Sequence, residues 1–160
     1  MSTRDATLPV APSVPGAAPH LLVVRAPYYR EVVDGLGDGA ARILREAGAT
    51  SETLDVAGAF ELPQAIRIAL HGRTRFDGYV ALGCVVRGET DHYDYLCREI
   101  LAGLMQVALT HGLALGAGVL TVHRIEQALA RSAPNGHNKG AEAAVAALVQ
   151  IAAGRRLGAF

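Results

Sequence analysis

Residues 79–99 read YVALGCVVRGETDHYDYLCRE, and a strand, a loop and the start of a helix follow one another in this stretch. The apolar run 79–86 has the length and β-branched content of a strand covered on both faces, as in a parallel sheet. In the polar loop 87–91, Thr90 or Asp91 is well placed to cap the helix that follows. The loop lies at the carboxyl end of the strand and the amino end of the helix. In open α/β sheets, ligands bind at the carboxyl ends of the strands, and free N–H groups at the start of a helix favour anions.

Strands alternate with helices along the rest of the chain. We expect strands at residues 20–24, 52–56, 79–86 and 115–122, and helices at about 29–47, 62–71, 92–111, 125–131 and 138–155. This alternation predicts an α/β fold with a four-stranded parallel sheet and helices on both faces. Residues 1–19 contain four scattered prolines and are expected to form a flexible Pro/Ala-rich tail before a single domain at 20–160.

The composition excludes several classes of protein. Lysine plus arginine equals aspartate plus glutamate, at 15 each, so the chain lacks the basic field that nucleic-acid binding needs. The most apolar stretch, 143–153, is shorter than the roughly 20 residues of a membrane span. Cys84 and Cys97 form no Cys-x-x-Cys motif, which predicts buried thiols rather than a disulfide or a metal site. With no apolar leader at the amino terminus, we expect a cytoplasmic location.

Three glycines, Gly35, Gly37 and Gly39, lie in the middle of the first expected helix. Their Gly-x-Gly-x-Gly spacing differs from the dinucleotide fingerprint, and they lie far from the strand that such a motif directly follows. Glycine disfavours a helix interior, so we expect a neighbouring helix to approach closely there.

Residues 83–95, GCVVRGETDHYDY, resemble the signature of the lumazine synthase family. Further blocks match in the expected order over most of residues 20–155: GAFELP at 58–63, GVLT at 118–121, IEQA at 125–128 and NKG at 138–140. The resemblance implies a flavodoxin-like three-layer sandwich. It also implies a transferase that condenses 5-amino-6-(D-ribitylamino)uracil with 3,4-dihydroxy-2-butanone 4-phosphate to 6,7-dimethyl-8-ribityllumazine, the penultimate step of riboflavin biosynthesis.

The same resemblance predicts no cofactor and no metal. It predicts a homopentamer whose active sites lie between subunits, and riboflavin synthase as a further partner. Decamers and icosahedral shells are also open, since relatives form both.

The resemblance assigns roles to individual residues. His92 would be the acid/base residue, because an imidazole titrates near neutrality. Tyr28 would stack on the pyrimidine. The remaining implied substrate-binding residues are Ala59, Phe60 and Glu61 at the ribityl chain, Cys84, Val85 and Val86 at the uracil, Glu89 and Thr90 at the phosphate, and Ala117, Arg131 and Lys139 from the neighbouring subunit.

From spacing alone, blander interpretations compete with these roles. A histidine in the first turn of a helix is more often a surface or packing residue. Glu61 would interact with the dipole of the next helix, and Arg131 would be a solvated charge at a helix end.

Departures from the family pattern leave two alternatives open. Pro27-Tyr28 stands where Arg-Phe is usual, Ala117 replaces a larger side chain, and His123-Arg124 stands where Glu-Asn is common. A catalytically weakened shell or scaffold paralogue would carry such changes. A flavodoxin-type nucleotide-binding module is the other alternative, but residues 25–29 contain no glycine, serine or threonine for its phosphate loop.

Overall fold

A four-stranded parallel sheet forms the centre of the computed structural model, which describes residues 9–134 and 137–159. The strands are β1 (His20–Arg25), β2 (Thr50–Asp55), β3 (Gly78–Val86) and β4 (Leu115–Val122), and their order across the sheet is β2-β1-β3-β4. All three pairings are parallel, as the alternation of strands and helices predicts.

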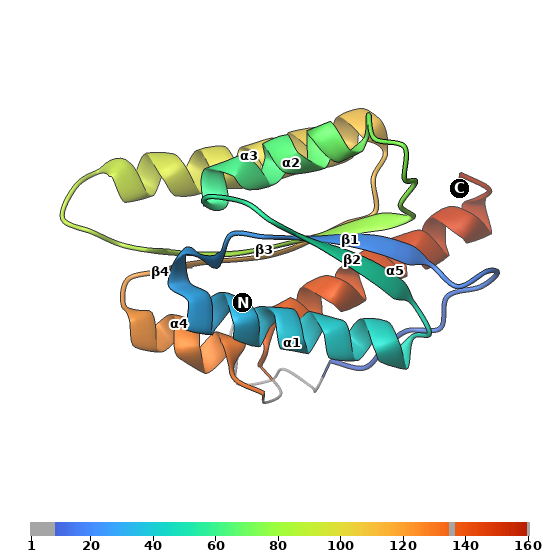
Figure 1. The fold of residues 1–160 in the computed structure, drawn as a ribbon, viewed down its shortest axis with the longest axis horizontal. Coiled ribbons are helices and arrows are strands. Elements are labelled where there is room, and N and C mark those ends of the chain that lie inside the picture. Colours follow the sequence, from blue (N-terminus) through green and yellow to red (C-terminus); the bar gives the residue numbers. More distant parts are fainter. Residues whose placement is uncertain (1–8, 135–136, 160) are drawn as a thin grey trace.

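Helices cover both faces of the sheet (Figure 1). On one face lie α1 (Arg30–Glu46), α4 (Ile125–Ser132) and α5 (Lys139–Leu157), and on the other lie α2 (Leu62–Ala69) and α3 (His92–His111). Two short 3₁₀ turns, η2 (Pro27–Tyr29) and η3 (Ala59–Glu61), lead from β1 into α1 and from β2 into α2. The predicted flavodoxin-like three-layer sandwich is therefore confirmed.

The central strand β3 explains the apolar run in the sequence. Its first eight residues are buried, because helices pack on both sides of it. Val80 and Leu82 contribute to the core beneath α1 and α5, whereas Tyr79 and Ala81 contribute to the core beneath α2 and α3. The edge strand β2, by contrast, is exposed along its whole length in the single chain.

The glycines of α1 provide space for close contacts, as predicted, at two of the three positions. A Cβ atom on Gly35 would lie 2.5 Å from the carbonyl oxygen of Ser132, and one on Gly39 would lie 2.1 Å from Oδ1 of Asn138. Gly37 instead faces the flexible side chain of Arg25, 3.4 Å away. The contacts bring the junction between α4 and α5 against α1.

The sheet has a switch point between its two middle strands. From β1 the chain continues to β2 on one side, and from β3 it continues to β4 on the other. Since the connections diverge, a crevice opens at the carboxyl ends of β1 and β3, which is where α/β folds bind ligands. The turn 27–29 and the loop 87–91 lie at this crevice.

The predicted side-chain cap of α3 is wrong. Asp91 occupies the N-cap position with φ −68° and ψ −5°, but no side chain there accepts a hydrogen bond from the helix. Its backbone conformation is already helical, whereas a capping residue usually has an extended conformation that turns its oxygen onto the helix N–H groups.

The segment before β1 contacts the domain. The guanidinium of Arg155 donates hydrogen bonds of 2.8 and 2.6 Å to the carbonyl oxygens of Pro15 and Ala17, and Ala11 and Val14 pack against the core. Residues 1–8 of the predicted tail lie outside the described residues, and the boundary at residue 20 stays a prediction. No helix in the described ranges is long and apolar enough to cross a membrane.

Candidate active site

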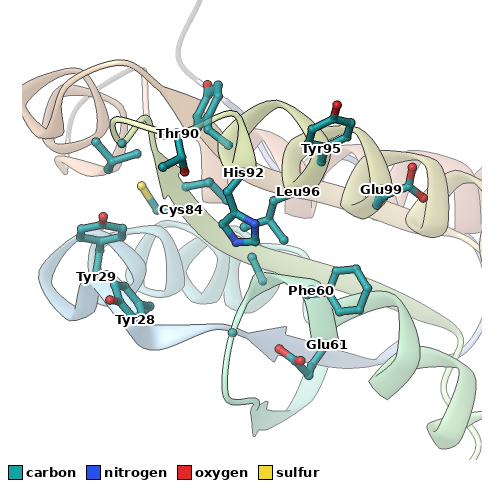
Figure 2. Close-up of a pocket in the computed structure, with 16 residues that line it drawn as sticks. Tyr28, Tyr29, Phe60, Glu61, Cys84, Thr90, His92, Tyr95, Leu96 and Glu99 are labelled. Atoms are coloured by element: carbon teal, nitrogen blue, oxygen red, sulfur yellow. The ribbon is translucent and has the colours of Figure 1, made fainter.

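A cavity of about 630 Å³ opens at the carboxyl ends of β1 and β3. It brings together most of the residues that the sequence singles out: Tyr28, Ala59, Phe60, Glu61, Cys84, Val85, Val86, Thr90 and His92. Four separate segments contribute these side chains (Figure 2). The volume suits a small organic ligand, since such sites measure about 300–1,000 Å³.

The turn η2 carries the aromatic wall. Pro27 occupies its first turn, where the missing N–H is harmless, and Tyr28 follows with 77% of its surface exposed. The ring of Tyr29 contacts that of Tyr28 edge to face, with centroids 5.2 Å apart. A 3₁₀ turn occupies the place of the glycine-rich phosphate loop that a flavodoxin-type nucleotide site would need.

The turn η3 carries a second wall. Ala59 is buried beneath it, whereas Phe60 and Glu61 reach the cavity (Figure 2). Gly58 precedes them in an extended conformation, and a Cβ atom there would lie 3.1 Å from Oε2 of Glu61. A carboxylate and an exposed ring thus stand side by side, which suits a ligand with hydroxyl groups next to an apolar surface.

The end of β3 supplies the floor of the cavity. Cys84 is 4% exposed, and burial raises the pKa of its thiol to about 11. Burial and the raised pKa make the thiol of Cys84 a poor nucleophile near neutral pH. Val85 and Val86 follow, and after Arg87 comes Gly88, where a Cβ atom would meet nothing within 4 Å. The backbone at Gly88 is therefore open to a ligand.

His92 enters from the start of α3. Figure 2 shows its imidazole pointing from the start of the helix into the space between Cys84 and Phe60, with Thr90 on the side away from Phe60. His92 is exposed, whereas the next residue, Tyr93, is buried. An exposed imidazole that faces a cavity meets the basic geometric requirement for proton transfer to a bound ligand.

Three predicted site residues lie elsewhere. Ala117, Arg131 and Lys139 line a second cavity of about 430 Å³ beside β4 and α5. There Nζ of Lys139 pairs with both carboxylate oxygens of Glu142, at 2.7 and 2.6 Å, and Arg131 donates to the carbonyl oxygen of Gln127 at 2.8 Å. The single chain therefore places nine of the predicted residues at the first cavity and three at the second.

The sequence patterns did not predict some of the residues that line the two cavities. In the main cavity they are Tyr29, Gly58, Gly88, Tyr93, Tyr95, Leu96 and Glu99. The last three follow His92 by three, four and seven residues, so helical periodicity carried a signal for them. In the second cavity, Glu142 follows Lys139 by three residues, again a helical spacing. The predicted Glu89 is exposed in the loop but does not line the main cavity.

Comparison with known proteins identifies the family. The family model described as 6,7-dimethyl-8-ribityllumazine synthase matches residues 18–154. The chain belongs to this family. A lumazine synthase of Agrobacterium fabrum is 46% identical over 144 residues, which cover 88% of this chain and 97% of the relative. One from Paramagnetospirillum magneticum is 42% identical, covering 86% and 96%.

The comparisons settle the family and the class of enzyme. A protein of Rhizobium meliloti described as 6,7-dimethyl-8-ribityllumazine synthase 1 is also 46% identical, covering 88% of this chain and 94% of the relative. The predicted family and the predicted enzyme are therefore confirmed for this lumazine synthase family member. The roles of individual residues and the assembly are separate questions.

Proposed function

We propose that the reaction of this lumazine synthase family member, the condensation of 5-amino-6-(D-ribitylamino)uracil with 3,4-dihydroxy-2-butanone 4-phosphate, takes place in the main cavity. The observation that carries this proposal is the meeting of Tyr28, Glu61, Thr90 and His92 around one cavity of about 630 Å³ at the switch point. These side chains offer a stacking surface, a carboxylate, a hydroxyl and a titratable imidazole to one ligand.

The pyrimidine and its side chain occupy the half of the cavity between η2 and η3. Tyr28 stacks on the flat ring, and the backbone of Cys84, Val85 and Val86 pairs with the ring's polar edge. The ribityl hydroxyls donate to Glu61, beside the exposed ring of Phe60 and the small Ala59.

The chemistry needs proton transfer but no oxidation. The amine of the uracil attacks the ketone and a first water leaves, phosphate is then eliminated, and the ribitylamino nitrogen closes the new ring on the carbonyl carbon so formed, which releases a second water. His92 supplies a proton to the departing oxygen and takes one back from the attacking amine, since imidazole can do both near neutral pH.

The phosphate lies at the loop before α3. Backbone N–H groups of Gly88 and Glu89 and the hydroxyl of Thr90 face it from one chain, at the amino end of a helix that no side chain caps. Arg131 and Lys139 complete the phosphate site from a neighbouring subunit, next to Ala117. Their position in a separate cavity supports this division, because one chain then holds two half-sites.

The surface of α3 supports assembly into a ring. Leu101, Met105 and Leu109 recur every fourth residue and are all exposed, Leu109 to 75%. An apolar stripe of this kind marks an interface. Two different half-sites on one chain require a head-to-tail contact, which closes into a ring when the rotation allows it. We propose a homopentamer.

The first experiment measures lumazine formation by absorbance and fluorescence in a size-exclusion fraction of known mass. We expect product from a pentamer or a larger assembly, and a loss of roughly 10²–10⁴-fold in kcat for His92→Gln. Because His92 is exposed, the variant should elute and unfold like the wild type. An assembled wild-type protein without turnover would favour the scaffold alternative. Pro27 and Ala117, which depart from the family pattern, are the observations behind that alternative.

A mixing experiment tests the shared site. Subunits of His92→Gln and Arg131→Ala, each inactive alone, are refolded together in equal amounts. If a site combines His92 of one subunit with Arg131 of the next, random mixing restores about a quarter of the wild-type activity. Mixtures as inactive as the single variants would place both residues in one chain's site, and an active Arg131→Ala variant would remove Arg131 from the site.

The proposal includes a cytoplasmic location and riboflavin synthase as the enzyme that consumes the product. Cys84 and Cys97 are free thiols, which suits a reducing compartment. Co-elution of the two purified enzymes would support a physical complex. Separate elution at micromolar concentration would show that the enzymes share only the lumazine product and do not bind one another.

A further inference from the structure

An ion pair spans the loop between β3 and α3. The guanidinium of Arg87 pairs with the carboxylate of Asp94, seven residues later in the first turn of α3. On the other side of the loop, the backbone N–H of Arg87 donates a hydrogen bond of 2.9 Å to the carbonyl oxygen of Val122 in β4. Arg87 is thus fixed to the sheet by its backbone and to the helix by its side chain.

The loop enclosed by this pair has few contacts of its own. Residues 88–90 are exposed, and within the described part of the chain no hydrogen bond ties their backbone to another element. A Cβ atom on Gly88 would meet nothing within 4 Å. The conformation of the loop therefore depends on what holds its two ends together.

Arg87 also holds the residue next to His92. Its guanidinium carbon lies 4.6 Å from the centre of the Tyr93 ring, close enough for a cation–π interaction. The buried Tyr93 ring meets His123 on another side, with centroids 6.1 Å apart at 64°. Arg87 therefore contacts both residues that follow His92, Tyr93 by stacking and Asp94 by charge.

We propose that Arg87 is a positioning residue of this enzyme, which acts with Asp94 to hold the 88–91 loop and His92 in their reactive arrangement. The proposal rests on the function proposed above. Direct binding of the substrate phosphate by Arg87 is the competing role, but its guanidinium is already paired with Asp94 and stacked on the Tyr93 ring.

A double-mutant cycle separates the two roles. Arg87→Gln, Asp94→Asn and the double variant are compared in steady-state kinetics with the butanone phosphate varied. If the pair positions the loop, each single variant loses roughly tenfold in kcat, and the double variant loses no more than either single one. The KM for the butanone phosphate stays within about twofold of the wild type.

The opposite pattern would overturn the proposal. If Arg87 binds the phosphate, Arg87→Gln raises this KM with little change in kcat, whereas Asp94→Asn lowers it by freeing the guanidinium. Fully additive losses would also count against a joint role. The matched control is the Arg42–Glu46 ion pair on α1, which is 2.8 Å long, comparably exposed and outside both cavities. Arg42→Gln and Glu46→Gln should leave kcat and KM unchanged.

A second measurement does not depend on turnover. Hydrogen exchange followed by mass spectrometry of the peptides that cover residues 87–95 should speed up equally in Arg87→Gln, Asp94→Asn and the double variant, and stay unchanged in the α1 controls. Unchanged exchange in the Arg87 and Asp94 variants would refute the positioning role. An inactive wild type would instead refute the proposed function. The hydrogen-exchange measurement would then still test whether Arg87 holds the loop.

Discussion

The side-chain amide of Asn138 donates a hydrogen bond of 2.8 Å to the carbonyl oxygen of Gly35, 103 residues earlier in the chain. The same nitrogen donates to the carbonyl oxygen of Ser132 at 2.7 Å, the carbonyl oxygen of Ala133 lies 3.2 Å from it, and Oδ1 accepts from the N–H of Ala141 at 3.0 Å. Asn138 is 3% exposed. One buried side chain thus joins α1, the end of α4 and the start of α5.

Removing this amide should destabilise the domain. Asn138→Ala leaves buried carbonyl groups without a donor, so we expect a loss of about 2–4 kcal/mol in the free energy of unfolding. Chemical denaturation at matched protein concentration measures it. The control is Gln150→Ala, which removes an exposed side chain with hydrogen bonds of 2.9 and 3.4 Å to the carbonyl oxygens of Leu115 and Ala146 and should cost under about 0.5 kcal/mol. Equal losses of unfolding free energy in both variants would show that the hydrogen bonds of Asn138 do not stabilise the contact between α1, α4 and α5.

The glycines of α1 offer a matched pair of alanine substitutions. Gly37→Ala places a Cβ atom 3.4 Å from the flexible Arg25 side chain and should stabilise the helix by up to about 1 kcal/mol. Gly39→Ala places the same atom 2.1 Å from Oδ1 of Asn138 and should destabilise by about 1–3 kcal/mol. The midpoints of thermal unfolding of the two variants, compared with that of the wild type, test both predictions. A midpoint for Gly39→Ala at or above that of the wild type would contradict the packing role of Gly39.

Much of this fold follows from local patterns in the sequence. The unbroken apolar run of β3 indicates a strand with both faces covered, and the alternation of such strands with helices leaves a parallel sheet as the consistent arrangement. The glycines of α1 indicate a close approach, although their spacing does not show that Asn138 and Ser132 fill the space. Gly37 shows the limit, since the same pattern contains a glycine with no close backbone neighbour.

The site was harder to predict. His92 and Thr90 belong to a recognisable motif. Tyr95, Leu96 and Glu99 reach the cavity because α3 continues from that motif, and the motif alone does not show which later residues of the helix face the cavity. The separation of Arg131 and Lys139 from His92 cannot be read from spacing, because it depends on how β4 and α5 lie beside β3. The side-chain cap failed because the α3 entrance is already helical at Asp91.

The buried thiol of Cys84 gives the stability a pH dependence. Burial raises its pKa from an ordinary 9.0 to about 11, so between these values the unfolded chain releases a proton that the folded chain keeps. Stability is therefore full below about pH 9 and falls as pH rises toward 11. Burial raises the pKa of Tyr79 and Tyr93 in the same direction. Urea midpoints should fall less steeply over this range in Cys84→Ala, and an unchanged slope would exclude the thiol.

Tyr28 provides a test of the stacking wall that leaves the fold intact. With 77% of its surface exposed, it contributes little to the core, so Tyr28→Ala should unfold like the wild type. Loss of a base-stacking ring costs about 1–3 kcal/mol, which predicts a rise of roughly 10–100-fold in the KM for the ribitylaminouracil. Tyr28→Phe keeps the ring and serves as the control, with a KM near the wild-type value. If the alanine variant also keeps that value, the pyrimidine stacks elsewhere, and the neighbouring ring of Tyr29 becomes the residue to substitute.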